Sequence, residues 1–159
     1  MDEVEDRLAS LLPRLRRFAH GLARDAADAD DLTQATAERI LKARAQWQRG
    51  TNFNAWAYRV MRNIWIDMAR SRQRTDRGRA SEEEGLAVGV TGDAEAKVEL
   101  GYLMRAMGQL PDEQREAVAL VMIEQLSYAE AAQVLEVPMG TLTSRLVRGR
   151  QALLAILED

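Results

Sequence analysis

The sequence contains no cysteine and only one histidine, His20. The absence of cysteine excludes a disulfide framework, a thiol nucleophile and zinc bound by thiolates. No apolar run approaches the ~20 residues of a membrane-spanning helix. The acidic start, MDEVEDRLAS, also differs from the basic and then apolar plan of a signal peptide. We therefore expect a cytoplasmic protein without membrane insertion.

Aromatic residues make up only 5% of the chain, whereas hydrophobic residues make up 47% and charged residues 30%. Ala, Leu, Arg and Glu dominate, and this balance favours helices over strands. A length of 159 residues suits one ordinary domain or two very small ones. We predict an all-α fold with two small helical domains, which are a three-to-four-helix bundle and a helix-turn-helix.

The formal net charge is −3, but the basic residues are concentrated in two segments. Between Arg59 and Arg79 there are seven arginines and two acids, and between Pro138 and Gln151 there are three arginines and no acid. The acids gather elsewhere, for example between Asp25 and Asp31. This distribution predicts two local contacts with an anionic partner.

The stretch from 75 to 95 is rich in glycine and lacks helical periodicity, so it is predicted to be a flexible linker. The predicted domains are then 1–74 and 96–159. In the first domain, Pro13 interrupts the apolar stripe, and we expect a break near Leu12 with a helix from Pro13 to about Ala23. Two further helices are expected, one opening in DAADADDL and one capped by Asn52.

The C-terminal segment has the pattern of a helix-turn-helix. Ser127 to Glu130 has the form of a capping box for a helix to about Leu135, the turn is Val137 to Gly140, and the next helix starts at Thr141. Its outer stripe predicts contacts with a DNA major groove, made by Thr141, Ser144, Arg148 and Gln151 with Arg145 at the flank. The alternative is a solvated, arginine-rich face.

Aromatic residues and arginines alternate on the outer face of the helix that follows Asn52. This combination suits stacking on single-stranded nucleic acid with contacts to its phosphates. The alternative is that Tyr58 and Trp65 pack inside the domain. The polar loop from Gln46 to Asn54 either accepts an extruded base or is a simple turn.

The acidic segment Asp28-Ala29-Asp30-Asp31-Leu32-Thr33-Gln34 cannot bind nucleic acid, because it would repel phosphate. No histidine, glycine-rich turn or second acidic cluster accompanies these carboxylates, so acid–base catalysis and a metal site are disfavoured. A protein-binding face remains. His20 is expected to be a packing or surface residue, and we predict no catalytic residue, metal or cofactor.

Three motifs together resemble the extracytoplasmic-function sigma factors of the sigma-70 family. DADDLTQATAERILK is similar to the family's polymerase-binding segment, and FNAWAYRVMRNIWIDMARSRQR is similar to its promoter-melting segment. The third, LPDEQREAVALVMIEQLSYAEAAQVLEVPMGTLTSRLVRGRQALL, is similar to its helix-turn-helix domain. LLPRLRRFAHGL and GTNFNAW further resemble the general stress-response subgroup.

The resemblance implies an alternative sigma factor, not an enzyme, with core RNA polymerase, promoter DNA and an anti-sigma factor as partners. The clamp coiled coil of the largest polymerase subunit would be bound by Asp28, Asp31, Leu32 and Gln34, and the polymerase flap would bind the second domain. The −10 element would be bound by Asn52, Tyr58, Arg59, Arg62, Asn63, Trp65 and Arg70. The −35 element would be bound by Thr141, Thr143, Ser144, Arg145 and Arg148.

Some residues depart from the family pattern. Ala35 and Ala37 stand where Glu and Phe are frequent, and Thr143 replaces a usual basic residue. Two other functions stay open, a sigma-like decoy that binds only an anti-sigma factor and a plain helix-turn-helix repressor. We also expect the linker to let the two domains pack together or clamp around a partner helix, which would cover their binding surfaces.

Overall fold

The computed structural model describes residues 2–23, 25–75 and 94–158, and all regular secondary structure in these ranges is helical. The N-terminal half contains α1 (Glu3–Ala23), α2 (Ala26–Lys42), a 3-10 turn η1 (Arg44–Gln46) and α3 (Phe53–Thr75). The C-terminal half contains α4 (Ala94–Met107), α5 (Asp112–Val118), a π-helical turn η2 (Ala119–Ile123), α6 (Tyr128–Leu135) and α7 (Met139–Glu158). The predicted linker lies outside the described residues except at its ends, which are helical.

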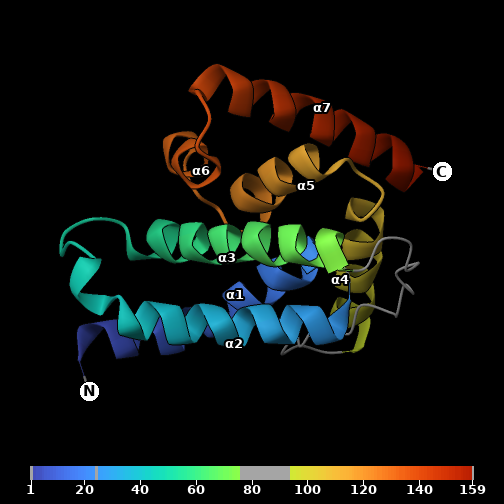
Figure 1. The fold of residues 1–159 in the computed structure, drawn as a ribbon. Helices are drawn as coiled ribbons and strands as arrows, with labels where there is room; N and C mark the ends of the chain where they lie inside the picture. The colour runs from blue at the N-terminus through green and yellow to red at the C-terminus, as the bar shows by residue number, and fades with distance from the viewer. Residues whose placement is uncertain (1, 24, 76–93, 159) are drawn as a thin grey trace.

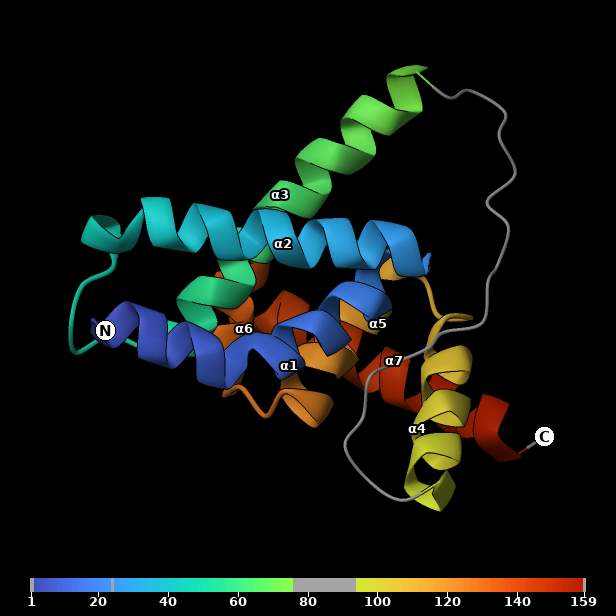
Figure 2. The same cartoon turned by 90° about the horizontal axis from the view of Figure 1, so that it is seen from below.

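The two halves pack directly on each other. In Figure 1, α3 lies between α2 on one side and α5, α6 and α7 on the other. Contacts between the halves join α3 to α6 and α1 to α5. Figure 2 shows α1 and α2 side by side, with α5–α7 behind them. Both DNA-binding candidates, α3 and α7, therefore belong to one assembly, in which α3 has helices packed on two of its sides.

The helix α1 is continuous, so the predicted break near Leu12 is wrong. Pro13 lies inside α1 and is exposed. An interior proline costs about 3 kcal/mol. The burial of one uninterrupted apolar stripe outweighs that cost, since each fully buried large aliphatic or aromatic side chain contributes about 1.5–3 kcal/mol. The stripe consists of Val4, Leu8, Leu11, Leu15, Phe18 and Leu22.

The predicted starts of the second and third helices are confirmed by side-chain caps. The Asp25 carboxylate accepts a hydrogen bond from the Ala27 amide at 3.0 Å, where α2 begins. The Asn52 side chain accepts one from the Ala55 amide, also at 3.0 Å, at the start of α3. Both caps satisfy amides that have no partner inside the helix.

The helix-turn-helix is also confirmed, with one shift of boundary. The Ser127 hydroxyl and the Glu130 carboxylate form the reciprocal capping box of α6. Glu136 then adopts a left-handed conformation, φ 56°, which ends α6. The helix α7 begins at Met139, two residues before the predicted Thr141. Its buried face contains Leu142, Leu146, Gly149 and Leu153.

The helical run that begins at Asp112 changes character within the apolar segment AVALVMI. It is α-helical only to Val118, and η2 follows. The Glu124 amide donates to the Ala119 carbonyl at 2.8 Å, which is the i to i−5 bond of a π turn. Gln125 then takes a φ of 61° and ends the helical run. The extra residue in this turn determines where Glu124 points.

None of the described helices is long and apolar enough to span a bilayer.

Candidate nucleic-acid interface

The face of α3 that was predicted to bind nucleic acid is partly covered by the C-terminal half. Four of its predicted residues each pair with a glutamate from that half: Asn52 with Glu130, Tyr58 with Glu124, Arg59 with Glu136, and Arg62 with Glu116. The Arg59–Glu136 ion pair is 2.7 Å long and half exposed, whereas the Arg62–Glu116 pair is largely buried. In this conformation the arginines therefore already have anionic partners.

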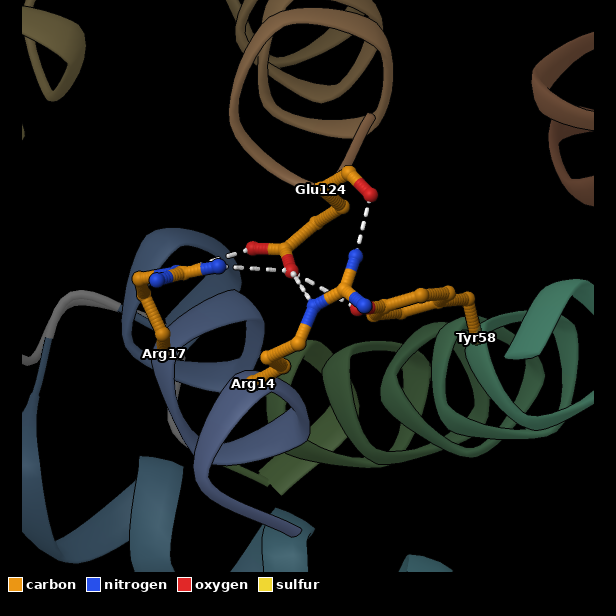
Figure 3. A network of polar contacts seen from close by, with 4 residues as sticks. All are labelled: Arg14, Arg17, Tyr58 and Glu124. Carbon is orange, nitrogen blue, oxygen red and sulfur yellow. Dashed lines mark hydrogen bonds and ion pairs between the residues drawn. The ribbon is translucent and has the colours of Figure 1, made fainter. Parts of the chain in front are cut away.

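Glu124 is the most buried of these acids, with a side chain only 1% exposed. Figure 3 shows its carboxylate between Arg14 and Arg17 of α1 and Tyr58 of α3. Arg17 makes two bonds to it, at 2.9 and 3.0 Å, and Arg14 makes one at 3.2 Å. The Arg14 guanidinium also donates to the Glu124 backbone carbonyl. The carboxylate is thus neutralised and hydrogen-bonded on both oxygens, which a buried charge requires.

The surroundings of Glu124 keep its partners in fixed protonation states. The bonds to Glu124 raise the pKa of Arg17, so its guanidinium stays charged. Burial, and then the nearby Glu124 charge, raise the pKa of the Tyr58 phenol far above its usual range. Tyr58 is therefore a neutral donor, and its hydroxyl donates to the Glu124 carboxylate at 2.7 Å.

Tyr58 is fully buried, so its placement on an outer, accessible face is corrected here. Its ring packs edge-on against Phe18 of α1, with centroids 5.3 Å apart. Trp65 is half-buried and packs against the core, whereas Asn63 and Arg70 are exposed. The helix α3 has buried residues on two of its faces, because the second half also packs on it. The single apolar stripe in its sequence does not predict this second buried face.

Arg14, Arg17 and Glu124 were not identified as site residues from the sequence. The arginines stand beside the apolar stripe of α1 in LLPRLRRFAHGL, where they resemble ordinary surface charges. Glu124 follows the apolar run AVALVMI, and a single acid at that place was the only available signal.

The loop before α3 is organised around Trp47, which is buried and packs edge-on against Phe53 at 5.3 Å. The Arg7 guanidinium lies 5.4 Å from the centre of the Trp47 ring. Gly50 has a φ of 94°, a conformation that favours glycine. The loop is therefore a folded turn anchored in the core.

The predicted polymerase-binding residues of α2 divide into two pairs. Leu32 is fully buried, and Asp28 is buried with its carboxylate paired to Arg72 of α3. Asp31 and Gln34 are exposed, and Gln34 contacts Glu38 at 3.4 Å. In this conformation only Asp31 and Gln34 are accessible to a partner.

The predicted reading face of α7 is open to solvent. Thr143, Ser144 and Arg148 are exposed, while Thr141 is half-buried. Arg145 is 22% exposed and lies 3.6 Å from Glu113 of α5. The opposite side of α7 packs on α4, α5 and α6. The two sets of candidates differ in their ion pairs. Arg59 and Arg62 pair with acids of the other half, whereas Arg145 pairs with Glu113 of its own half.

Comparison with known proteins assigns the family. Residues 8–75 match the model of sigma-70 region 2, and residues 100–153 match that of sigma-70 region 4. Over 156 residues the chain is 33% identical to the ECF RNA polymerase sigma factor EcfG of Rhodopseudomonas palustris, covering 98% of this chain and 86% of that protein. The chain belongs to the extracytoplasmic-function (ECF) sigma factors. It is thus an alternative sigma factor for promoter recognition and transcription initiation.

Two further relatives of this ECF sigma factor are informative. It is 37% identical to SigE of Mycolicibacterium smegmatis, over 88% of this chain and 56% of that protein. A crystal structure of the sigma factor RpoE of Bartonella quintana, in complex with the anti-sigma factor NepR, superposes with a TM-score of 0.88 at 28% identity. It covers 99% of this chain and 98% of RpoE, so the two halves are similarly placed in both proteins.

Proposed function

We propose that this sigma factor acts in the cytoplasm, without catalytic chemistry of its own, by binding core RNA polymerase through α2 and promoter DNA through α3 and α7. The observation that carries the assignment is that α7 presents an arginine and polar side chains on one side while its other side is buried. In α7 the exposed side contains Ser144 and Arg148, opposite Leu142 and Leu146.

The proposed −10 surface is the outer side of α3, with Arg59, Arg62 and Asn63 at its centre. Guanidinium groups bind phosphate oxygens in a planar fork, and an amide can hydrogen-bond a base edge. Arg70 and Asn52 extend this surface toward the two ends of α3. Trp65, half-buried at its edge, offers a ring for stacking.

The proposed polymerase surface is the exposed side of α2 around Asp31 and Gln34. Asp28 has a different role in this proposal, because its carboxylate joins α2 to Arg72 of α3 and so orients the surface. The clamp coiled coil of the largest polymerase subunit remains the proposed partner.

We further propose regulation by an anti-sigma factor. The support is the similarity to RpoE of Bartonella quintana, which was crystallised with the anti-sigma factor NepR. Membership of the general stress-response subgroup stays a prediction.

The test is reconstituted transcription with purified core polymerase and a library of genomic promoter fragments. We expect the wild-type chain to direct transcription and strand opening, measured by permanganate reactivity. Arg59→Ala/Arg62→Ala should lose opening while keeping polymerase binding. Arg105→Ala, an exposed change in α4 outside the proposed surfaces, should serve as the control. A decoy would give no transcript at all, and a repressor would bind promoter fragments tightly without polymerase.

A further inference from the structure

The seam between the two halves has a strong charge asymmetry. Its N-terminal side supplies four arginines, two from α1 and two from α3, and its C-terminal side supplies three glutamates that pair with them. The arginines are Arg14, Arg17, Arg59 and Arg62, and the glutamates are Glu116, Glu124 and Glu136. The pattern is one basic strip that faces one acidic strip.

A carboxylate and a phosphate make the same kind of bond to a guanidinium. Both present paired oxygens to its planar N–H fork, so an arginine that binds one can bind the other. Arg17 uses two nitrogens to hold both oxygens of Glu124 in this way. The strip on α1 and α3 therefore has the chemistry of a phosphate-binding surface with internal carboxylates as its present ligands.

Promoter binding by both halves at once requires them to separate. The centres of the −35 and −10 elements are about 25 base pairs apart, which is about 85 Å of duplex at 3.4 Å per base pair. A compact chain of this length has a radius of gyration of only about 15 Å. The seam must open when both elements are bound, and opening removes the glutamates from all four arginines together.

We propose that Arg14 and Arg17 belong with Arg59 and Arg62 to one phosphate-binding strip for single-stranded DNA, which the glutamates of the C-terminal half occupy in the isolated chain. The isolated chain is then closed toward the −10 strand while the reading face of α7 stays open. This inference rests on the proposed −10 surface of α3 and extends it to α1. It makes the C-terminal half a competitive, intramolecular inhibitor of its neighbour.

The test measures binding of the full chain, without polymerase, to a fluorescein-labelled single-stranded 20-mer of mixed sequence. Glu124→Gln keeps the shape of the side chain and removes its charge. Hydrogen bonds to charged groups are the stronger ones, so this change weakens the contacts between Glu124 and the two arginines. We therefore expect the oligonucleotide to bind about tenfold more tightly. Glu99→Gln is the matched control, because it makes the same charge change at an exposed position of α4. It should bind as the wild type does.

The salt dependence tests whether Arg14 and Arg17 contact phosphate. Each phosphate neutralised on a single strand changes the slope of log K against log salt by about −0.7. In the Glu124→Gln background, Arg14→Gln/Arg17→Gln should therefore make the slope shallower by about 1.4. A purely structural role for these arginines would leave the slope of the opened chain unchanged.

Two outcomes would overturn the inference. One is a folded Glu124→Gln chain that binds the oligonucleotide no better than Glu99→Gln. The other is an unchanged salt slope after Arg14 and Arg17 are replaced. If circular dichroism shows that Glu124→Gln does not fold, Glu136→Gln at the exposed rim of the seam gives the same comparison. Failure of the proposed −10 surface itself would instead appear as normal transcription by the Arg59→Ala/Arg62→Ala holoenzyme.

Discussion

Tyr58 and Glu124 come from different halves of the chain, and the Tyr58 hydroxyl donates to the Glu124 carboxylate at 2.7 Å. The contact joins α3 to the residue that follows the π turn. An aromatic residue on the proposed DNA-binding helix thus helps to solvate a buried acid in the closed chain. The Tyr58 hydroxyl loses this acceptor when the halves part.

The packing of α7 on α5 depends on a missing side chain at Gly149. A Cβ atom there would lie 2.7 Å from Val118 Cγ2 and 3.1 Å from the Gln114 carbonyl oxygen. We expect Gly149→Ala to destabilise the protein by about 1–3 kcal/mol in chemical denaturation, because the core is overpacked. Gly140→Ala in the same helix meets nothing within 4 Å and should be neutral or stabilising by up to about 1 kcal/mol. Equal effects of the two changes would contradict the close approach of these helices.

Polymerase binding should depend on the exposed side of α2. Asp31→Arg and Gln34→Ala should each weaken binding to core RNA polymerase in a pull-down. The free energy of unfolding should stay within about 0.5 kcal/mol of the wild-type value, because both residues are exposed. Glu158→Arg, an equivalent charge reversal at the exposed end of α7, is the control. Unchanged affinity for Asp31→Arg would mean that the polymerase contact lies elsewhere.

The arginines of α7 should divide into reading and anchoring residues. Arg148 is exposed on the outer side, and a base-edge contact there would be worth about 1–3 kcal/mol of discrimination. Arg145 is at the flank near Glu113, so it is better placed for phosphate. Transcription from a set of −35 variants should show altered base preference for Arg148→Ala and a uniform loss for Arg145→Ala. The reverse result would invert the assignment. If neither substitution had an effect, α7 would not bind in the major groove as proposed.

His20 should make stability depend on pH. It is buried between α1 and α2, and neither ring nitrogen has a hydrogen-bond partner among the described residues. Burial is the largest cause that lowers the pKa of His20; Asp30, 4.0 Å away, opposes the shift and Arg16 adds to it. At pH values between the lowered pKa and the unfolded pKa of about 6.5, the unfolded chain binds more protons than the folded chain. The contribution of His20 to the free energy of unfolding therefore rises with pH in this range, by at most about 1.4 kcal/mol per pH unit. Above the unfolded pKa this contribution no longer changes with pH.

The measurement is urea denaturation at several pH values from 5.5 to 7.5 for the wild type and His20→Leu. The difference between the two proteins isolates the histidine from the carboxylates, which titrate in both. A parallel pH dependence of the two proteins would show that His20 is protonated equally in the folded and unfolded chains.

Local signals in the sequence predicted the helices well. These signals are the caps at Asn52 and Ser127, the apolar stripes and the turn at Val137. They act over three or four residues, so they can be recognised in the sequence before the fold is known. The effect of Pro13 was predicted wrongly. The cost of a proline inside a helix is local, and it is outweighed by the burial of an apolar stripe that continues on both sides of Pro13. The π turn was missed because no residue type marks an added residue within a helix.

The candidate site was predicted only in part, because its decisive contacts are distant in the sequence. Arg14 and Arg17 meet Glu124 across separations of 110 and 107 residues. Asp28 and Arg72 are 44 residues apart, so the burial of Asp28 has no local signal either. The charge segments predicted two contacts with an anionic partner, and those contacts stay a prediction. They could not predict that the acids of the second half would cover one of those segments.

The π turn determines the direction in which the residues after α5, including Glu124, point from the helix axis. Successive residues of an α-helix are rotated by about 100° around its axis, since 3.6 residues make a turn. Deleting one residue between Ala119 and Ile123 would restore the ordinary helical register and rotate Glu124 by roughly that angle away from α1. A chain one residue shorter would then lose the pairing of Glu124 with Arg14 and Arg17. The length of the chain in this one turn therefore sets whether the buried acid of the second half faces the arginines of α1.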